Sequence, residues 1–142
     1  MPAPALPRRP ALSLALVLLP GLVLASEPVT GTPMSGAEFE AYTQGMTLTF
    51  SAQGQVYGAE QYLSGRRVMW AFTEDICREG HWYEENGQIC FSYDYDPAPQ
   101  CWVFWEDGGL NALFMGAPNG TRLKEVSKSS APLPCAGPEV GV

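Results

Sequence analysis

Short alternations of apolar and polar residues, separated by turn sequences, make up most of the chain after Gly45. Residues 67–73 are the clearest example, because Val68, Trp70 and Phe72 occupy every second position. Successive side chains of a β-strand point to opposite faces, so a period of two residues predicts a strand with one buried side. We therefore expect this part of the chain to form β-structure.

The alternation predicts about eight short strands, over residues 46–51, 55–63, 67–73, 81–84, 88–95, 100–106, 110–115 and 121–126. Asn86-Gly87, between two of them, is a strong hairpin signal. The connections are too short for crossover helices, so neighbouring strands are antiparallel. Such a meander closes into a barrel or folds into a sandwich, because an open sheet exposes unpaired edges. We predict a mainly β fold, either a small lipocalin-like barrel or a sandwich, with an up-and-down barrel as the first choice.

A helical signal precedes the strands. Ser35 and Glu38 have the spacing of a capping box, in which each side chain bonds the backbone N–H of the other residue. Gly45 is typical of the end of a helix, where the backbone often turns left-handed. The pattern predicts one short helix over residues 36–44, ahead of the sheet.

The first 25 residues have the three parts of a secretory signal peptide in order. Arg8 and Arg9 precede an apolar run at residues 11–24, and the small Ala25 stands directly before the expected cleavage site. The apolar run is shorter than the about 20 residues that a membrane-spanning helix needs. We expect export to the periplasm or secretion, with no stable membrane anchor after cleavage.

The remaining chain divides into three parts. Residues 26–34 are rich in proline, glycine and threonine and are typical of a linker. Residues 35–126 contain the predicted helix and strands and form one β-rich domain. Residues 127–142 are a tail rich in serine, proline and glycine, in which Cys135 is the only anchor.

The chain has four cysteines, and an even number in an exported domain predicts disulfides. A chain that turns between Tyr95 and Asp96 places Cys90 opposite Cys101, within reach of a cross-strand disulfide. Cys77 then pairs with Cys135 by elimination. The competing arrangement pairs Cys77 with Cys90 and Cys101 with Cys135, and it stays open because the first pairing depends on where the turn falls. No Cys-x-x-Cys spacing is present, which disfavours a zinc site.

The composition is acidic, with 15 acidic and 8 basic residues and a net charge of −7. Loss of Arg8 and Arg9 with the signal peptide changes −7 to −9. This charge argues against binding to nucleic acid, which needs clustered lysine and arginine, and against anionic membrane surfaces. The expected partner is therefore an unidentified small ligand or a cationic protein.

The candidates for catalysis are weak. His81 is the only histidine, and no Gly-x-Ser-x-Gly motif supplies a nucleophile to accompany it. Asp94 and Asp96 can share a strand face, but two carboxylates are too few for a calcium site, which takes six or more ligands. We expect a non-catalytic protein with no cofactor and no metal.

Aromatic residues are dense for so short a chain, with 4 tryptophans, 6 tyrosines and 6 phenylalanines. In a barrel they either fill the interior or line a ligand cavity. Trp70, Trp82 and Trp102 are the candidate lining residues, together with Glu60 if its carboxyl group points inward. The leading hypothesis is an exported binding module for a small apolar or aromatic ligand. The alternative is a protein-binding module, such as an inhibitor of a cationic cell-wall hydrolase.

Part of the chain resembles a group of small exported proteobacterial domains of unknown function. The resemblance covers roughly residues 36–106 and rests on Gly58-x-Glu60-x-Tyr62, Arg67-x-x-Trp70, Cys77-x-x-Gly80-x-Trp82-Tyr83, Ile89-Cys90-Phe91 and Cys101-Trp102. It implies export and a small domain with paired cysteines, and it implies no activity.

Overall fold

The computed structural model describes residues 29–72 and 76–135. The predicted signal peptide, residues 1–25, and its cleavage site lie outside these residues. Of the helices in the described part of the chain, none is long and apolar enough to cross a membrane.

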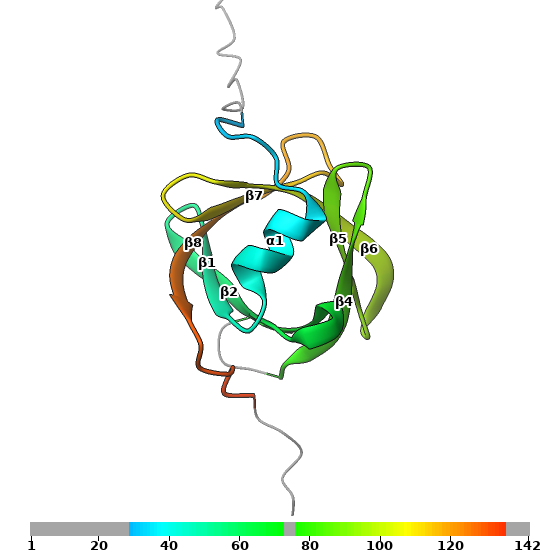
Figure 1. Ribbon diagram of the computed structural model, residues 1–142, viewed down its shortest axis with the longest axis vertical. Coiled ribbons are helices and arrows are strands. Elements are labelled where there is room, and N and C mark those ends of the chain that lie inside the picture. Colours follow the sequence, from blue (N-terminus) through cyan, green and yellow to red (C-terminus); the bar gives the residue numbers. More distant parts are fainter. Residues whose placement is uncertain (1–28, 73–75, 136–142) are drawn as a thin grey trace, which may run out of the picture.

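Eight antiparallel strands form a closed barrel in the order of the sequence. The strands are β1 (Thr47–Ala52), β2 (Gln55–Tyr62), β3 (Arg67–Ala71), β4 (Arg78–Glu85), β5 (Gln88–Tyr93), β6 (Asp96–Glu106), β7 (Leu110–Phe114) and β8 (Arg122–Ser129). The barrel closes because β8 pairs with β1, where Leu48 lies opposite Lys128. The prediction of a small lipocalin-like barrel is confirmed, and the sandwich is excluded. Figure 1 shows the barrel viewed along its axis.

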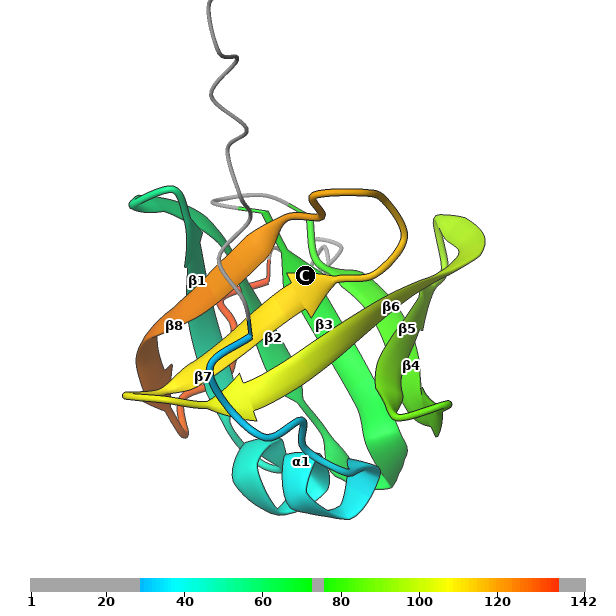
Figure 2. The same ribbon diagram turned by 90° about the horizontal axis from the view of Figure 1, so that it is seen from above.

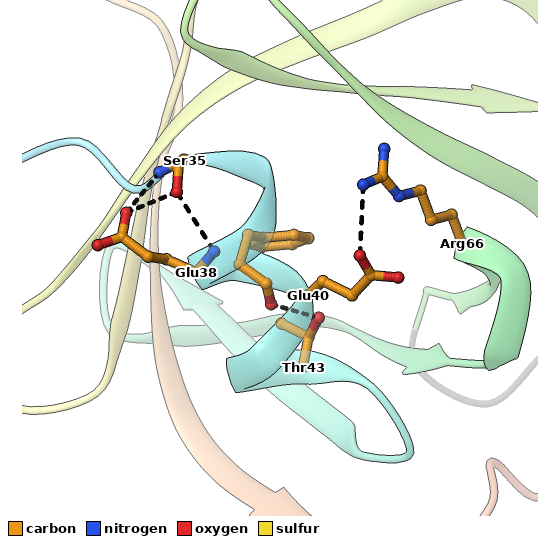
Figure 3. Close-up of polar contacts among 6 residues, drawn as sticks. Ser35, Glu38, Glu40, Thr43 and Arg66 are labelled. Carbon is orange, nitrogen blue, oxygen red and sulfur yellow. Dashed lines mark hydrogen bonds and ion pairs between the residues drawn. The ribbon is translucent and has the colours of Figure 1, made fainter.

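The helix α1 (Gly36–Thr43) precedes the barrel, as the capping box predicts. The Ser35 Oγ atom accepts a hydrogen bond of 3.3 Å from the Glu38 backbone N–H. The Glu38 carboxylate accepts one of 2.8 Å from the Ser35 backbone N–H (Figure 3). Gly45 follows the helix with φ of +79°, a conformation that glycine adopts without steric cost.

One end of the barrel is closed by α1, which lies across it (Figures 1 and 2). The Phe39 side chain points from the helix into the barrel and is fully buried. Its ring centroid lies 4.6 Å from that of Phe104 and 5.1 Å from that of Trp82. Burial of a phenylalanine side chain contributes roughly 2 to 3 kcal/mol. The helix therefore acts as a plug, and the polar atoms of its first turn stay outside.

The helix is also tied to the barrel wall by a short turn of 3₁₀-helix at Ser64–Arg66. The Arg66 guanidinium lies 3.3 Å from the Glu40 carboxylate (Figure 3). The same guanidinium lies over the Trp82 ring, 4.5 Å from its centroid. Because the ion pair is exposed, it contributes little to stability.

The hairpin between β5 and β6 turns earlier than predicted. Tyr93 lies opposite Asp96, so the turn is formed by Asp94 and Tyr95. A shift of register between Phe91 and Tyr93 then brings Cys90 opposite Cys101. The alternation of apolar and polar residues does not predict a bulge of this kind, because it indicates a period of two residues but not the position of an extra residue.

The strand β6 begins at Asp96 and runs through Pro97 and Pro99, a segment expected to be a connection. Proline has no N–H and interrupts a central sheet ladder. Pairing between β6 and β7 begins only at Trp102, so the two prolines interrupt no hydrogen bonds to β7. The strand β4 also begins earlier than predicted, at Arg78 and not at His81.

Two disulfides are present, Cys90–Cys101 and Cys77–Cys135. The first joins the neighbouring strands β5 and β6, and the second joins the start of β4 to the segment after β8. The competing arrangement does not form. Two disulfides indicate an oxidising environment outside the cytoplasm.

Both flanks of the predicted domain lie against the barrel. The Met34 N–H donates a hydrogen bond of 2.8 Å to the Phe104 carbonyl oxygen, and Gly31 packs on the Trp105 ring. The residues before α1 thus cover Trp105, which is only 4% exposed although it points out of the barrel. At the other flank, β8 continues to Ser129, three residues beyond the predicted end of the last strand.

Candidate functional site

A cavity of about 40 Å³ lies inside the barrel, near the end that α1 leaves open. Its walls are aromatic and its floor holds a carboxyl group. Aromatic side chains from β2 and the end of β3 form one wall, and those from β5 and the turn after it form another. The rest of the lining comes from β1, β6 and β8, with Phe50, Gln100, Trp102, Phe104 and Leu123. The turn between β5 and β6 and the end of β3 form its rim.

The β2–β3 wall consists of Tyr57, Trp70 and Phe72, whose rings form a triangle. The ring centroids are 5.8 Å apart for Tyr57 and Trp70, and 5.3 Å apart for Trp70 and Phe72. The close approach of the Trp70 ring to β2 requires Gly58, because a Cβ atom there would lie 2.7 Å from the Ala71 carbonyl oxygen and equally close to the ring. Phe72 is 49% exposed and forms the outer edge of this wall.

The β5 wall consists of Phe91 and Tyr93, at the end of the strand, and of Tyr95 in the turn that follows. The stacked rings of Tyr93 and Tyr95 have centroids 5.7 Å apart. Tyr95 lies at the rim and is 42% exposed. The guanidinium of Arg78, from the start of β4, lies over the Tyr95 ring, 5.3 Å from its centroid. The rim therefore already binds one cation by a cation–π contact.

Glu60 forms the floor of the cavity. Gly58, Glu60 and Tyr62 occupy every second position of β2, and all three are buried. The Glu60 side chain therefore points into the barrel. Only 4% of it is exposed. The Tyr93 hydroxyl donates a hydrogen bond of 2.7 Å to Oε1, and the Tyr62 hydroxyl donates one of 3.3 Å to Oε2.

Burial raises the pKa of Glu60 from 4.5 to about 8, against the two tyrosine hydrogen bonds, which lower it. At pH 7 about nine in ten molecules then have a neutral Glu60. The pKa values of Tyr62 and Tyr93 are raised well above 10, first by burial and then by the charge of Glu60. Both tyrosines therefore remain hydrogen-bond donors at every physiological pH.

The carboxyl group has acceptor capacity that the barrel does not use. A carboxylate offers about four lone-pair sites, and the two tyrosines occupy two of them. Among the described residues that line the cavity there is no lysine, arginine or histidine. A hydrogen-bond donor that enters from outside thus finds a buried acceptor without a charged competitor.

Three of the four residues predicted to line a ligand site surround this cavity, namely Trp70, Trp102 and Glu60. Trp82 lies at the opposite end of the barrel, where it packs against Phe39 and under Arg66. The alternation along a strand places a residue on the inner face, but it does not distinguish the plugged end from the open one.

The weak candidates for catalysis lie away from the cavity. His81 is exposed on the outer face of β4, with its ring 6.3 Å from that of Tyr83. Asp94 is exposed in the β5–β6 turn, and Asp96 is half-buried at the start of β6, where its carboxylate accepts a bond from the Ala98 backbone N–H. In the part of the chain that the structure describes, no group of three histidine, cysteine or acidic side chains could hold a metal ion.

Sequence reasoning missed the tyrosines of the site, although a signal for them was present. Ile89, Phe91, Tyr93 and Tyr95 occupy every second position from the start of β5. This period predicts a shared face. What it does not predict is which hydroxyl reaches Glu60, because that contact crosses the barrel.

Comparison of the chain with protein-family models, with curated proteins and with solved structures found no match. The resemblance to small exported domains therefore stays a prediction, and the barrel and its cavity are the basis for a proposal about function.

Proposed function

We propose that the protein is an exported, non-catalytic binding module that takes a small ligand with an apolar or aromatic body into the open end of its barrel. The observation that carries this proposal is the pair of aromatic walls facing each other above one buried carboxyl group. Ligand sites typically combine apolar and aromatic walls with a few polar groups that fix orientation. The mouth of a β-barrel is a common place for them.

The size of the cavity limits the ligand. Its 40 Å³ is far below the 300–1,000 Å³ of sites for drug-sized molecules. It is enough for about three water molecules, or for one slim chemical group. A larger body has to lie at the rim, between Phe72 and Tyr95, whose rings are about half exposed. The fit is therefore to a molecule of about the size of one substituted aromatic ring.

The location outside the cytoplasm agrees with such a role. The predicted signal peptide supports export to the periplasm or secretion, and the two disulfides are stable there. The alternative function, inhibition of a cationic cell-wall hydrolase, is supported by the acidic net charge, the disulfides and the small size of the domain. The acidic charge favours solubility as readily as a cationic partner.

Titration of the ¹⁵N-labelled mature protein with 2-phenylethanol and with phenethylamine, followed by amide chemical shifts, tests the binding proposal. We expect saturable shifts for at least one of the two probes, centred on Gly58, Phe72 and Tyr95. The F72A variant should weaken binding at least threefold, because it removes the outer edge of one wall. Val126 is similarly exposed, at 55%, but lies on β8 outside the cavity, so the V126A variant is the matched control.

Two results would overturn the proposal. One is the absence of saturable shifts for both probes up to their solubility limits. The other is a set of shifts that maps to a different face of the barrel and is unaffected by F72A.

A further inference from the structure

We infer that the ligand is a small organic ammonium ion, whose charged nitrogen reaches the carboxyl group of Glu60 while its apolar or aromatic body lies between the two aromatic walls. This inference rests on the proposed binding function and names the chemical class of the ligand. Three features of the cavity support it: the floor, the walls and the width.

The floor supplies the charge and the acceptors. Glu60 has the only carboxyl group among the described residues that line the cavity. The hydroxyls of Tyr93 and Tyr62 approach one oxygen each, so each oxygen keeps acceptor capacity for a further donor. An ammonium group offers up to three donors and a positive charge, and hydrogen bonds to a charged partner are about twice as strong as neutral ones.

The walls favour a cation over a neutral group. The faces of tyrosine, tryptophan and phenylalanine carry negative electrostatic potential, and sites for organic ammonium ions are commonly built from several such rings. Tyr57, Trp70 and Phe72, from β2 and the end of β3, and Tyr93 and Tyr95, from β5 and the turn after it, line the cavity together with Glu60. At the rim, the Tyr95 ring already accepts a cation, the guanidinium of Arg78.

The width selects the shape of the ligand. A chamber of 40 Å³ admits a slim head, such as a primary ammonium group on a methylene, and excludes a bulky ring from the floor. The ring or alkyl body then stays at the half-exposed rim. An arylalkylamine with one or two methylenes between the ring and the nitrogen matches this division.

Binding of a cation has to compete with the proton that Glu60 carries when the site is empty. The groups that face Glu60 are Tyr62 on its own strand and Tyr93 on β5, and both keep their protons throughout the relevant range. Glu125 of β8, whose charge acts on Tyr62, is held at the helix end of the barrel by bonds from the Tyr42 hydroxyl and the Leu110 backbone N–H. Glu60 is therefore the group whose ionisation controls binding of a cation.

The competition predicts a pH dependence of definite sign. If only the ionised form binds the ammonium ion, the affinity rises by up to roughly 50-fold from pH 6 to pH 8, as the binding-competent fraction grows. An alkylammonium ion keeps its own charge over this range. A neutral ligand of the same shape has no reason to follow this dependence.

The test compares phenethylamine with 2-phenylethanol, which has the same body and a hydroxyl in place of the ammonium group. At pH 8 we expect the amine to bind at least tenfold more tightly than the alcohol, and at pH 6 we expect most of that difference to be lost. The E60Q variant keeps a polar floor without the charge and should lose most of the preference for the amine, with only the contribution of the rings left. The E125Q variant removes an acid at the other end of the barrel and should keep the preference for the amine.

Calorimetry in two buffers of different ionisation enthalpy gives an independent readout. At pH 6.5 we expect release of nearly one proton per amine bound by the unaltered protein, and none by E60Q. Equal affinity for the alcohol and the amine would overturn the ammonium inference and leave the binding function intact. An undiminished preference for the amine in E60Q would overturn it as well, whereas the absence of binding by both probes would overturn the binding function itself.

Discussion

The Tyr93 hydroxyl donates a hydrogen bond of 2.7 Å to Oε1 of Glu60, which lies 33 residues earlier in the chain. The two residues stand on β5 and β2, which are not neighbours in the barrel, so the bond crosses its interior. It holds the carboxyl group between the aromatic walls and away from bulk water. The closed barrel thus brings a titratable group and its donor together where neither strand alone forms a site.

Folding stability should fall as the pH rises from about 4.5 to about 8. Burial raises the pKa of Glu60 in the folded state to about 8, so in this window the folded protein holds a proton that the unfolded chain releases. The stabilising contribution is complete below the unfolded pKa and is lost as the pH rises through the folded one. Each unit of pKa shift corresponds to about 1.4 kcal/mol, so the loss is on the order of a few kcal/mol.

Urea unfolding at pH 5, 6, 7 and 8 measures this dependence. E60Q has no proton to lose at this position, so the free energy of unfolding of the unaltered protein minus that of E60Q should decrease steadily with pH. A difference that stays constant across the four values would show that Glu60 titrates normally in the folded state.

Loss of the Tyr93 hydroxyl should raise the pKa of Glu60 further, because the hydrogen bond from Tyr93 stabilises the charged carboxylate. In the Y93F variant we expect a carboxyl titration midpoint above that of the unaltered protein, and a loss of about 1 kcal/mol in stability at pH 8. The carboxyl ¹³C shift of Glu60 reports the midpoint. The neighbouring Tyr95 makes no hydrogen bond to Glu60, so Y95F should leave the midpoint in place.

Removal of the Phe39 ring should destabilise the protein by about 3 to 5 kcal/mol, because it leaves a cavity among closely packed aromatic rings. Thermal unfolding of F39A checks this. E40Q is the matched control on the same helix, since it breaks only the exposed ion pair with Arg66 and should cost less than about 1 kcal/mol. If the two variants had similar stability, the helix would not be a plug.

The two disulfides should differ in their contribution to stability. Cys77–Cys135 spans 58 positions and Cys90–Cys101 spans 11, so the chain-entropy model assigns about 4 kcal/mol to the first and about 3 kcal/mol to the second. Unfolding of the paired alanine variants C77A/C135A and C90A/C101A measures the contributions. A larger loss from the second pair would mean that native packing around β5 and β6, and not chain entropy, dominates.

Local patterns in the sequence were sufficient for the strands, the helix and the inward direction of Trp70 and Trp102. Each of these features depends on a period of two residues or on a capping box that spans four residues. The sequence predicted either a closed barrel or a sandwich. It did not distinguish the two, because the pairing of β8 with β1 joins residues far apart in the sequence and leaves no local pattern.

The site itself depended on information that a single sequence does not contain. The sequence left the direction of Glu60 open, and its bond to Tyr93 needs the barrel to be closed. The position of Trp82 at the plugged end of the barrel has the same origin, since the path of the chain through Phe39 decides which end α1 covers.

The measurement that tests the account most directly is the titration of the Glu60 carboxyl ¹³C shift with and without saturating phenethylamine, with the resonance assigned by its loss in E60Q. The account predicts a midpoint near 8 in the empty protein and a midpoint below 7 in the complex, because the ammonium ion stabilises the carboxylate. A midpoint that is the same in both states would contradict it, since the charged nitrogen of the ligand would then lie away from Glu60.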